Sequence, residues 1–173
     1  MKTIPSCIYH SRETACKSPY GAVPAGQTVT FSTYPKREHG TEHITLWVEE
    51  DGCTPQAYPM RWYGLAGARD RYSVTFTPDH PGLYWYYFTT VTADGPRYCA
   101  RGYGGRGESI DALGDKYQLT VYDPAYQPPG WFGEGITYNI FPDRFCRDRL
   151  PEQPEGEGIA PRVLHENWDD IPA

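Results

Sequence analysis

Two pairs of aromatic side chains carry the clearest binding chemistry in the sequence, Trp62 with Tyr63 and Trp85 with Tyr87. Trp and Tyr combine a flat apolar ring with a polar edge, which suits the C–H face of a pyranose ring. These four residues are therefore candidate carbohydrate contacts. The run 83–88 points large side chains to both of its faces, so one face can fill a core. The other face must be covered by loops, a second domain or a second copy of the chain, or serve as a stacking surface.

The sequence contains no recognisable catalytic, metal-binding or cofactor-binding motif. A match to G-x-G-x-x-G at 102–107 precedes a polar, glycine-interrupted stretch instead of the helix that a dinucleotide fold requires, so it favours a hairpin loop. The adjacent carboxylates Asp169 and Asp170 cannot face each other across a cleft, as the two carboxyl groups of a glycosidase do. We therefore expect no catalytic residue, no metal site and no cofactor.

Charge and cysteine usage narrow the class of protein and its compartment. The 173 residues carry a net charge of -6 and a sequence pI of about 5.3, which argues against a nucleic-acid partner. The sequence contains no run of about 18 apolar residues, so no membrane span is expected. The first residues lack the apolar core of a secretory signal. Five scattered cysteines without a C-x-x-C spacing favour free thiols. We expect a cytoplasmic protein.

The elements that must position the aromatic residues are short strands separated by Gly, Pro and Asp. Six runs are rich in β-branched or aromatic residues, and several of them alternate apolar with polar side chains. Helical periodicity is missing between these runs, so parallel crossovers are excluded and an all-β, antiparallel sandwich is expected. The predicted strands are 27–34, 43–49, 59–65, 71–77, 83–92 and 116–122.

One local pattern resembles the tyrosine corner of immunoglobulin-like sandwiches. Tyr84 follows two residues after Gly82, which opens a strand, and its hydroxyl is expected to bond back to the upstream backbone. Tyr86 occupies the position of the second cysteine of antibody domains. The pattern thus predicts an immunoglobulin-like sandwich without the inter-sheet disulfide.

A composition change marks a domain boundary near residue 123. Residues 1–123 carry 12 basic and 13 acidic side chains, whereas residues 124–173 carry 4 basic and 9 acidic side chains. The stretch that begins at Pro124 contains Pro-Pro-Gly and is typical of a linker. We therefore predict a sandwich domain at 1–123, a linker at 124–134 and a separate segment at 135–173.

The last segment also carries a family resemblance. Residues 135–145 read GITYNIFPDRF, an apolar strand that follows a glycine and ends at a proline. This segment resembles the first barrel strand of the alpha-amylase family (glycoside hydrolase family 13), especially its neopullulanase and cyclomaltodextrinase branch. Residues 117–123 resemble the last strand of the amino-terminal sandwich of those enzymes, and 165–172 are similar to the stretch after the barrel strand.

The resemblance implies a fragment of a larger enzyme. A (β/α)₈ barrel takes about 250 residues, but 39 residues lie from Gly135 onward, so we expect one orphaned barrel strand in a partly disordered tail. The family's catalytic carboxylates belong to later barrel strands, and the chain alone is expected to be inactive. Its expected role is to support an alpha-glucan hydrolase (starch, maltodextrin, pullulan or cyclodextrin). It would do so by packing on the missing barrel, by forming a homodimer or by binding the alpha-glucan.

Two alternatives remain open at this point. The chain could be a self-sufficient carbohydrate-binding module whose affinity lies in the four aromatic residues. It could also be an immunoglobulin-like interaction domain unrelated to sugars.

Overall fold

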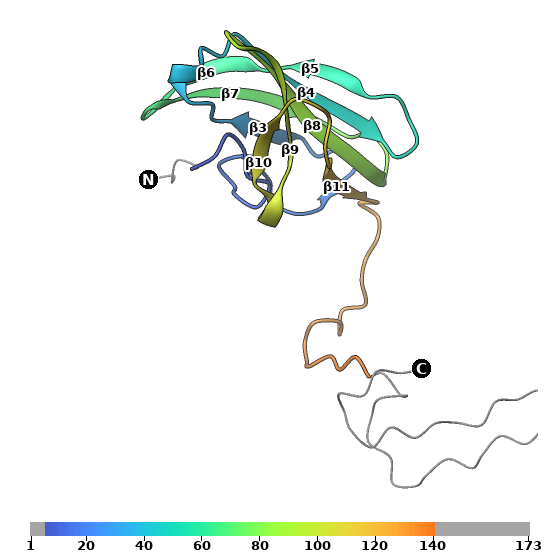
Figure 1. Ribbon diagram of the computed structural model, residues 1–173. Coiled ribbons are helices and arrows are strands. Elements are labelled where there is room, and N and C mark those ends of the chain that lie inside the picture. Colours follow the sequence, from blue (N-terminus) through green and yellow to red (C-terminus); the bar gives the residue numbers. More distant parts are fainter. Residues whose placement is uncertain (1–5, 141–173) are drawn as a thin grey trace, which may run out of the picture. The chain divides into compact units, whose positions relative to one another are not determined.

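The computed structural model describes residues 6–140, which form eleven strands and two short 3₁₀ helices (Figure 1). By compactness the chain divides into residues 1–128 and residues 129–173, a division that falls inside the predicted linker. The elements are β1 (Lys17–Ser18), β2 (Val23–Pro24), β3 (Val29–Thr33), η1 (Arg37–His39), β4 (His43–Glu50), β5 (Gln56–Pro59), β6 (Arg61–Ala66), β7 (Arg69–Phe76), β8 (Gly82–Thr92), β9 (Gly95–Arg101), η2 (Tyr103–Gly105), β10 (Gly107–Ile110) and β11 (Tyr117–Tyr122).

The strands form two sheets, which are the layers of a sandwich in Figure 1. The four-stranded sheet has the order β1-β3-β7-β6. The seven-stranded sheet has the order β10-β9-β8-β11-β2, with β4 added beside β8 and β5 beside β4. Strand β8 is the centre of this sheet, because β4 pairs along one of its edges while β11 and β9 share the other. The all-β sandwich predicted from the sequence is confirmed.

One pairing differs from the antiparallel expectation. Val121 of β11 lies opposite Val23 of β2, and these two strands run parallel. Parallel strands need a long connection, and here nearly the whole sandwich lies between them in the chain, so no helical crossover is required.

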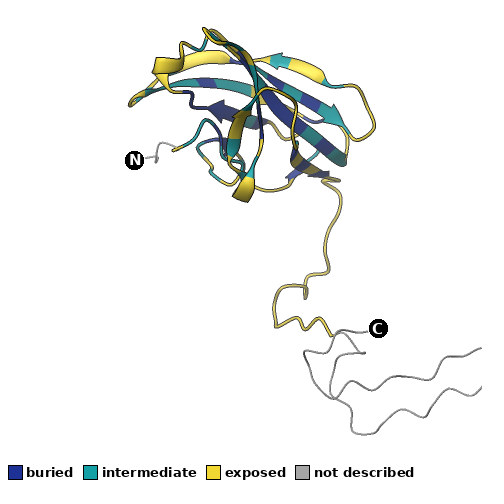
Figure 2. Ribbon diagram, viewed as in Figure 1, coloured by how far each residue is buried: buried dark blue, intermediate teal, exposed yellow. Residues whose placement is uncertain are grey.

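The core lies between the two sheets because each strand alternates inward and outward residues. Tyr84, Tyr86 and Phe88 of β8 point inward and meet Phe31 of β3 and Phe76 of β7. Figure 2 shows that β8 is buried or partly buried over nearly all of its length, whereas β5 and β6 are largely exposed.

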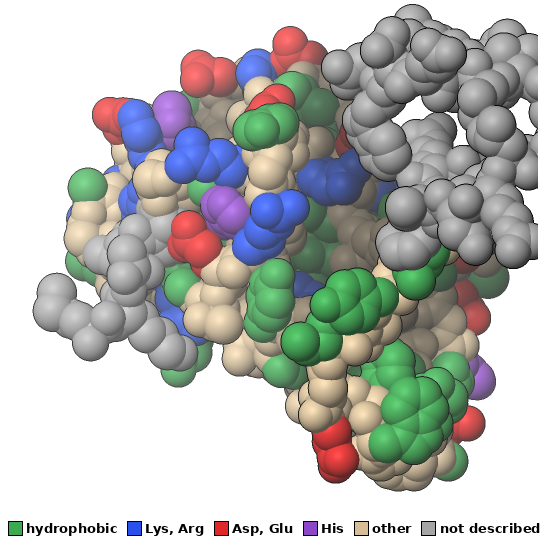
Figure 3. All heavy atoms as spheres, turned by 90° about the horizontal axis from the view of Figure 1, so that it is seen from below, with side chains coloured by type: hydrophobic (Ala, Val, Ile, Leu, Met, Phe, Trp, Pro, Cys, Tyr) green, Lys and Arg blue, Asp and Glu red, His purple; other side chains and the backbone are tan. Residues whose placement is uncertain are grey.

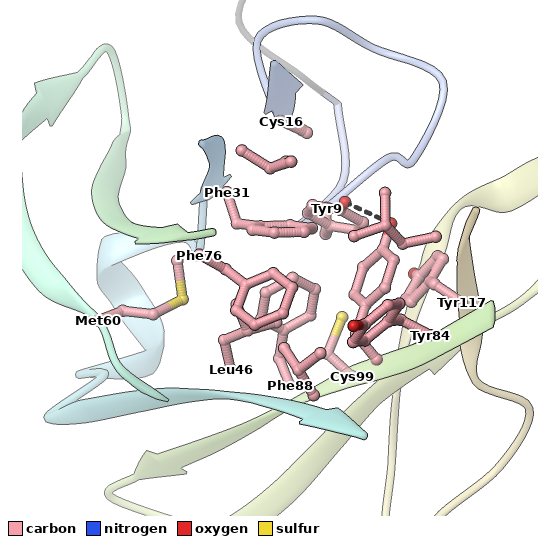
Figure 4. Packing of buried hydrophobic residues seen from close by; sticks show 14 of the residues in the cluster. Tyr9, Cys16, Phe31, Leu46, Met60, Phe76, Tyr84, Phe88, Cys99 and Tyr117 are labelled. Atoms are coloured by element: carbon pink, nitrogen blue, oxygen red, sulfur yellow. Dashed lines mark hydrogen bonds between the residues drawn. The ribbon is translucent and has the colours of Figure 1, made fainter. Parts of the chain in front are cut away.

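Tyr9, which precedes the first strand, fills the centre of this core (Figure 4). Its hydroxyl hydrogen-bonds to that of Tyr86 at 2.9 Å, and its ring packs against Phe88 and Tyr117. Tyr86 stacks on Tyr117 with ring centroids 5.1 Å apart. Aromatic packing therefore occupies the place where an antibody domain has its disulfide.

The tyrosine corner is present. The hydroxyl of Tyr84 donates to the carbonyl of His80 at 3.0 Å, so the hydrogen bond predicted from Gly82 and Tyr84 is confirmed. Four of the five cysteines lie in the described residues, and all four are free thiols, as expected: Cys7, Cys16, Cys53 and Cys99.

The described part of the second unit, residues 129–140, consists of turns and irregular chain. Residues 136–140 form no strand and are exposed, so the predicted barrel strand is not confirmed over these residues. Phe141, the stretch at 165–172 and most of the tail expected to be disordered lie outside the described residues. Among residues 6–140, no helix is long and apolar enough to cross a membrane.

Candidate functional site

The structure places the four predicted carbohydrate contacts on two different sheets. Trp62 and Tyr63 lie on β6, at the edge of the four-stranded sheet, while Trp85 and Tyr87 lie on β8, in the middle of the seven-stranded sheet. The four candidate residues therefore belong to two separate surfaces.

The β8 pair belongs to an aromatic face on the outer side of its sheet. Trp47 of β4 lies opposite Tyr87, and their rings stack with centroids 6.2 Å apart and an interplanar angle of 8°. Tyr87 is 8% exposed, so little of its ring is free. The indole N–H groups are also engaged, because Trp47 donates to Thr89 at 2.9 Å and Trp85 donates to Asp51 at 2.7 Å. This face suits burial against another protein surface better than stacking on a sugar.

The β6 pair is far more open, with Trp62 56% and Tyr63 70% exposed. A β-bulge between Trp62 and Gly64 shifts the pairing with β7, and Gly64 has a φ of 145°, which side-chain-bearing residues rarely adopt. Adjacent strand residues face opposite sides, and the two aromatic residues accordingly meet different partners on β7. Trp62 meets Asp70, and Tyr63 meets Arg71.

Trp62 forms a small polar cluster with Asp70 and Arg37. The indole Nε1 donates to Asp70 Oδ1 at 3.0 Å, and Arg37 Nε lies 3.9 Å from Asp70 Oδ2. Asp70 is held by its backbone N–H, which donates to the carbonyl of Pro35 at 3.0 Å. The result is an exposed indole ring with a carboxylate and a guanidinium at its edge. Such a group can stack on an apolar ring face and hydrogen-bond to its substituents.

Sequence reasoning missed Asp70 and Arg37. They are 33 positions apart, and only the pairing of β6 with β7 and the turn at η1 bring them to Trp62. The sequence does show a carboxylate, Asp70, directly before Arg71. This signal is weak as long as the pairing of the strands is unknown.

A separate cleft of about 470 Å³ lies between the amino-terminal segment and the β8–β9 hairpin. Its cations already have partners, since Arg69 donates to the carbonyls of Tyr34 and Ser6 and Arg97 pairs with Asp111 at 2.6 Å. Figure 3 shows basic, acidic and histidine side chains mixed on the face that it displays. Within residues 6–140 no group of three or more His, Cys, Asp or Glu side chains could hold a metal ion.

Comparison with known proteins relates the chain to a family. No protein-family model matches the chain. The amylopullulanase of Thermoanaerobacterium saccharolyticum is 31% identical over 168 residues, covering 90% of this chain and 13% of that protein. The amylopullulanase of Thermoanaerobacter thermohydrosulfuricus is 32% identical over 170 residues, covering 90% of this chain and 11% of that protein. This chain is homologous to enzymes of the alpha-amylase family. The resemblance to the amino-terminal region of such an enzyme is thus confirmed.

The fold of the chain also matches that of a solved structure. A solved structure of a cyclomaltodextrinase superposes with a TM-score of 0.53 over 89% of this chain and 26% of that chain, at 19% identity. The chain spans about a tenth of the curated relatives that it matches. The matched region is thus a small part of each of these longer proteins.

Proposed function

We propose that this domain is a non-catalytic part of an alpha-amylase-family hydrolase acting on alpha-glucans, and that it contacts the glucan through Trp62. The names of the relatives support the substrate class, because amylopullulanases match over nine-tenths of this chain. The observation that carries the contact is the exposed Trp62 ring with Asp70 hydrogen-bonded at its edge.

The chemistry of the Trp62 cluster fits a glucan. A glucose ring presents C–H groups on its faces and hydroxyl groups around its rim, so an indole ring and a neighbouring carboxylate address both parts. Asp70 can accept from sugar hydroxyls and Arg37 can donate to them. Tyr63 faces away from this cluster and is not part of the same contact.

The outer face around Trp47, Trp85 and Tyr87 supports a second role. Tyr87 is buried, Trp47 and Trp85 are partly buried, and the indole N–H groups of both tryptophans donate hydrogen bonds within the domain. Aromatic residues with few unpaired polar groups are typical of the centre of a protein interface. We therefore assign this face to packing on the catalytic barrel or on a second copy of the chain.

Calorimetric titration with maltoheptaose tests the glucan contact. The wild-type chain should bind with a Kd on the order of 1 mM, a value common for a single shallow site. Trp62→Ala should weaken binding at least about tenfold, since it removes the stacking surface. Trp85→Phe is the matched control and should bind as the wild type does. An absence of heat up to about 10 mM ligand, or a loss of binding in the control instead, would contradict the proposal.

A further inference from the structure

A relay of hydrogen bonds crosses the outer face of the four-stranded sheet and ends at Arg71. Arg71 Nη2 donates to Ser32 Oγ at 3.2 Å, the two serine hydroxyls lie 3.1 Å apart, and Ser73 donates to the carbonyl of Phe31 at 3.1 Å. A guanidinium can only donate and a carbonyl can only accept. The direction of the relay is therefore fixed, from Arg71 through Ser32 and Ser73 to Phe31, and it holds the guanidinium in one orientation.

The guanidinium of Arg71 has no counter-charge among residues 6–140. No carboxylate among the described residues lies within 4 Å of Arg71 or of Arg61, whereas Lys36, Arg97 and Lys116 each pair with one. Arg61 lies opposite Ser73 in the register of β6 and β7, and so lies on the same face as Arg71. Two cations thus share this face without a described counter-charge.

The ring of Tyr63 covers one side of the same guanidinium. The Arg71 Cζ lies 4.5 Å from the centre of the Tyr63 ring, a cation–π contact. The Nε atom is buried and has no hydrogen-bond partner among the described residues. With Nη2 engaged by Ser32, the edge that contains Nη1 has no described partner and is left for a ligand.

We infer that Arg71, with Arg61 beside it, binds an oxyanion, either a phosphate monoester or a carboxylate. A planar guanidinium held in place recognises such groups through paired, charge-assisted hydrogen bonds, and a neighbouring arginine adds to the attraction. Trp62 points to the other side of β6, so this site does not depend on the glucan contact. Failure of one proposal leaves the other standing.

Nuclear magnetic resonance of the arginine Nε–H groups tests the site directly. The ligands are inorganic phosphate, glucose 6-phosphate, acetate and glucuronate, each added at pH 7 with ionic strength held constant by sodium chloride. The Arg71 signal should move and saturate with a Kd on the order of 1–10 mM. Comparison of the Kd values for the two phosphate ligands with those for the two carboxylates then shows which oxyanion the site prefers. Neutral glucose should leave the signal unmoved.

Variants separate a specific site from general attraction. Followed through the Nε–H signal of Arg61, Arg71→Gln should weaken anion binding at least tenfold, while Arg101→Gln, which alters an exposed arginine on β9, should leave it unchanged. Arg71→Lys keeps the charge without the planar fork and should also bind more weakly, which preserves the test if the Gln variant fails to fold. The inference would be overturned if the chemical shifts rose linearly with every anion and never saturated. It would also be overturned if Arg71→Lys or Arg71→Gln bound the anions as tightly as the wild type, or if glucose moved the signal as far as the anions do.

Discussion

The hydroxyl of Tyr9 lies 2.9 Å from the hydroxyl of Tyr86, and both side chains are completely buried. The two residues are 77 positions apart in the chain. This contact joins the amino-terminal segment to the central strand β8 at the position where an antibody domain has its inter-sheet disulfide. Within residues 6–140 each hydroxyl has no hydrogen-bond partner except the other, so removal of either one leaves an unpaired buried group.

Replacement of these tyrosines should show strong coupling. Tyr9→Phe and Tyr86→Phe should each lower the free energy of unfolding by about 1–3 kcal/mol, because the remaining hydroxyl is stranded in the core. The double variant should be more stable than the sum of the two losses predicts, since it leaves no unpaired hydroxyl. Urea unfolding of the four proteins measures this. Additive losses would show that the hydrogen bond is not the coupling element.

The fold should lose stability at alkaline pH. Burial raises the pKa of the Cys16 and Cys99 thiols from an ordinary 9.0 to about 12, and burial also raises the pKa of Tyr86 and Tyr117. The unfolded chain therefore releases these protons first, so the stabilisation is complete below pH 9 and declines as the pH rises toward 12.

Removal of the two thiols isolates their part of the alkaline effect. In Cys16→Ala/Cys99→Ala, the loss of unfolding free energy between pH 9 and pH 11 should be roughly 2–4 kcal/mol smaller than in the wild type. Urea unfolding at both pH values measures the difference. The same loss in both proteins would mean that these thiols are not the titrating groups.

Lys17 should contribute with the opposite sign. Burial lowers the pKa of its ammonium from 10.5 to about 8, although the ammonium donates to the carbonyls of Pro19 and Gly21. Between these two values the unfolded chain binds more protons, so this contribution to stability increases with pH. From pH 7 to pH 9 the wild type should gain roughly 1 kcal/mol relative to Lys17→Met in urea unfolding. An equal pH dependence in both proteins would exclude Lys17 as the cause.

The fold was largely predictable because its strands alternate. The six predicted runs overlap the observed strands β3, β4, β6, β7, β8 and β11, and the Tyr84 corner was predicted correctly. Strands β9 and β10 were not predicted, because Gly95, Pro96 and the glycines at 102–107 indicate turns. The pairing of β9 with β8, and of β10 with β9, overrides that local preference. The parallel partner of β11 could not be predicted, since a two-residue strand carries no periodic pattern.

The candidate sites were less predictable than the fold. Composition identified Trp62 and Tyr63, but their separation onto two sides of β6 depends on the pleat and on the bulge at Gly64. The polar partners Asp70 and Arg71 are sequence neighbours that serve different sites for the same reason. Residues 136–140 resemble a barrel strand, yet a strand requires neighbours for its backbone groups, and none pairs with them in the described structure.

The chain should have no hydrolytic activity of its own. Incubation of the purified protein with starch, pullulan or cyclodextrin should release no reducing sugar above a heat-denatured control. The expectation follows from the family resemblance, in which the catalytic carboxylates belong to later parts of the enzyme. Release of reducing sugar that grows with protein concentration would contradict it.

The most direct test of the glucan contact is the indole N–H resonance of Trp62 during titration with maltoheptaose. The account predicts a progressive, saturating shift of this signal, because Nε1 hydrogen-bonds to Asp70 at the edge of the proposed contact. The signals of Trp47 and Trp85, whose N–H groups are engaged on the other sheet, should stay in place. A stationary Trp62 signal, or a shift confined to Trp85, would contradict the assignment of the glucan contact to β6.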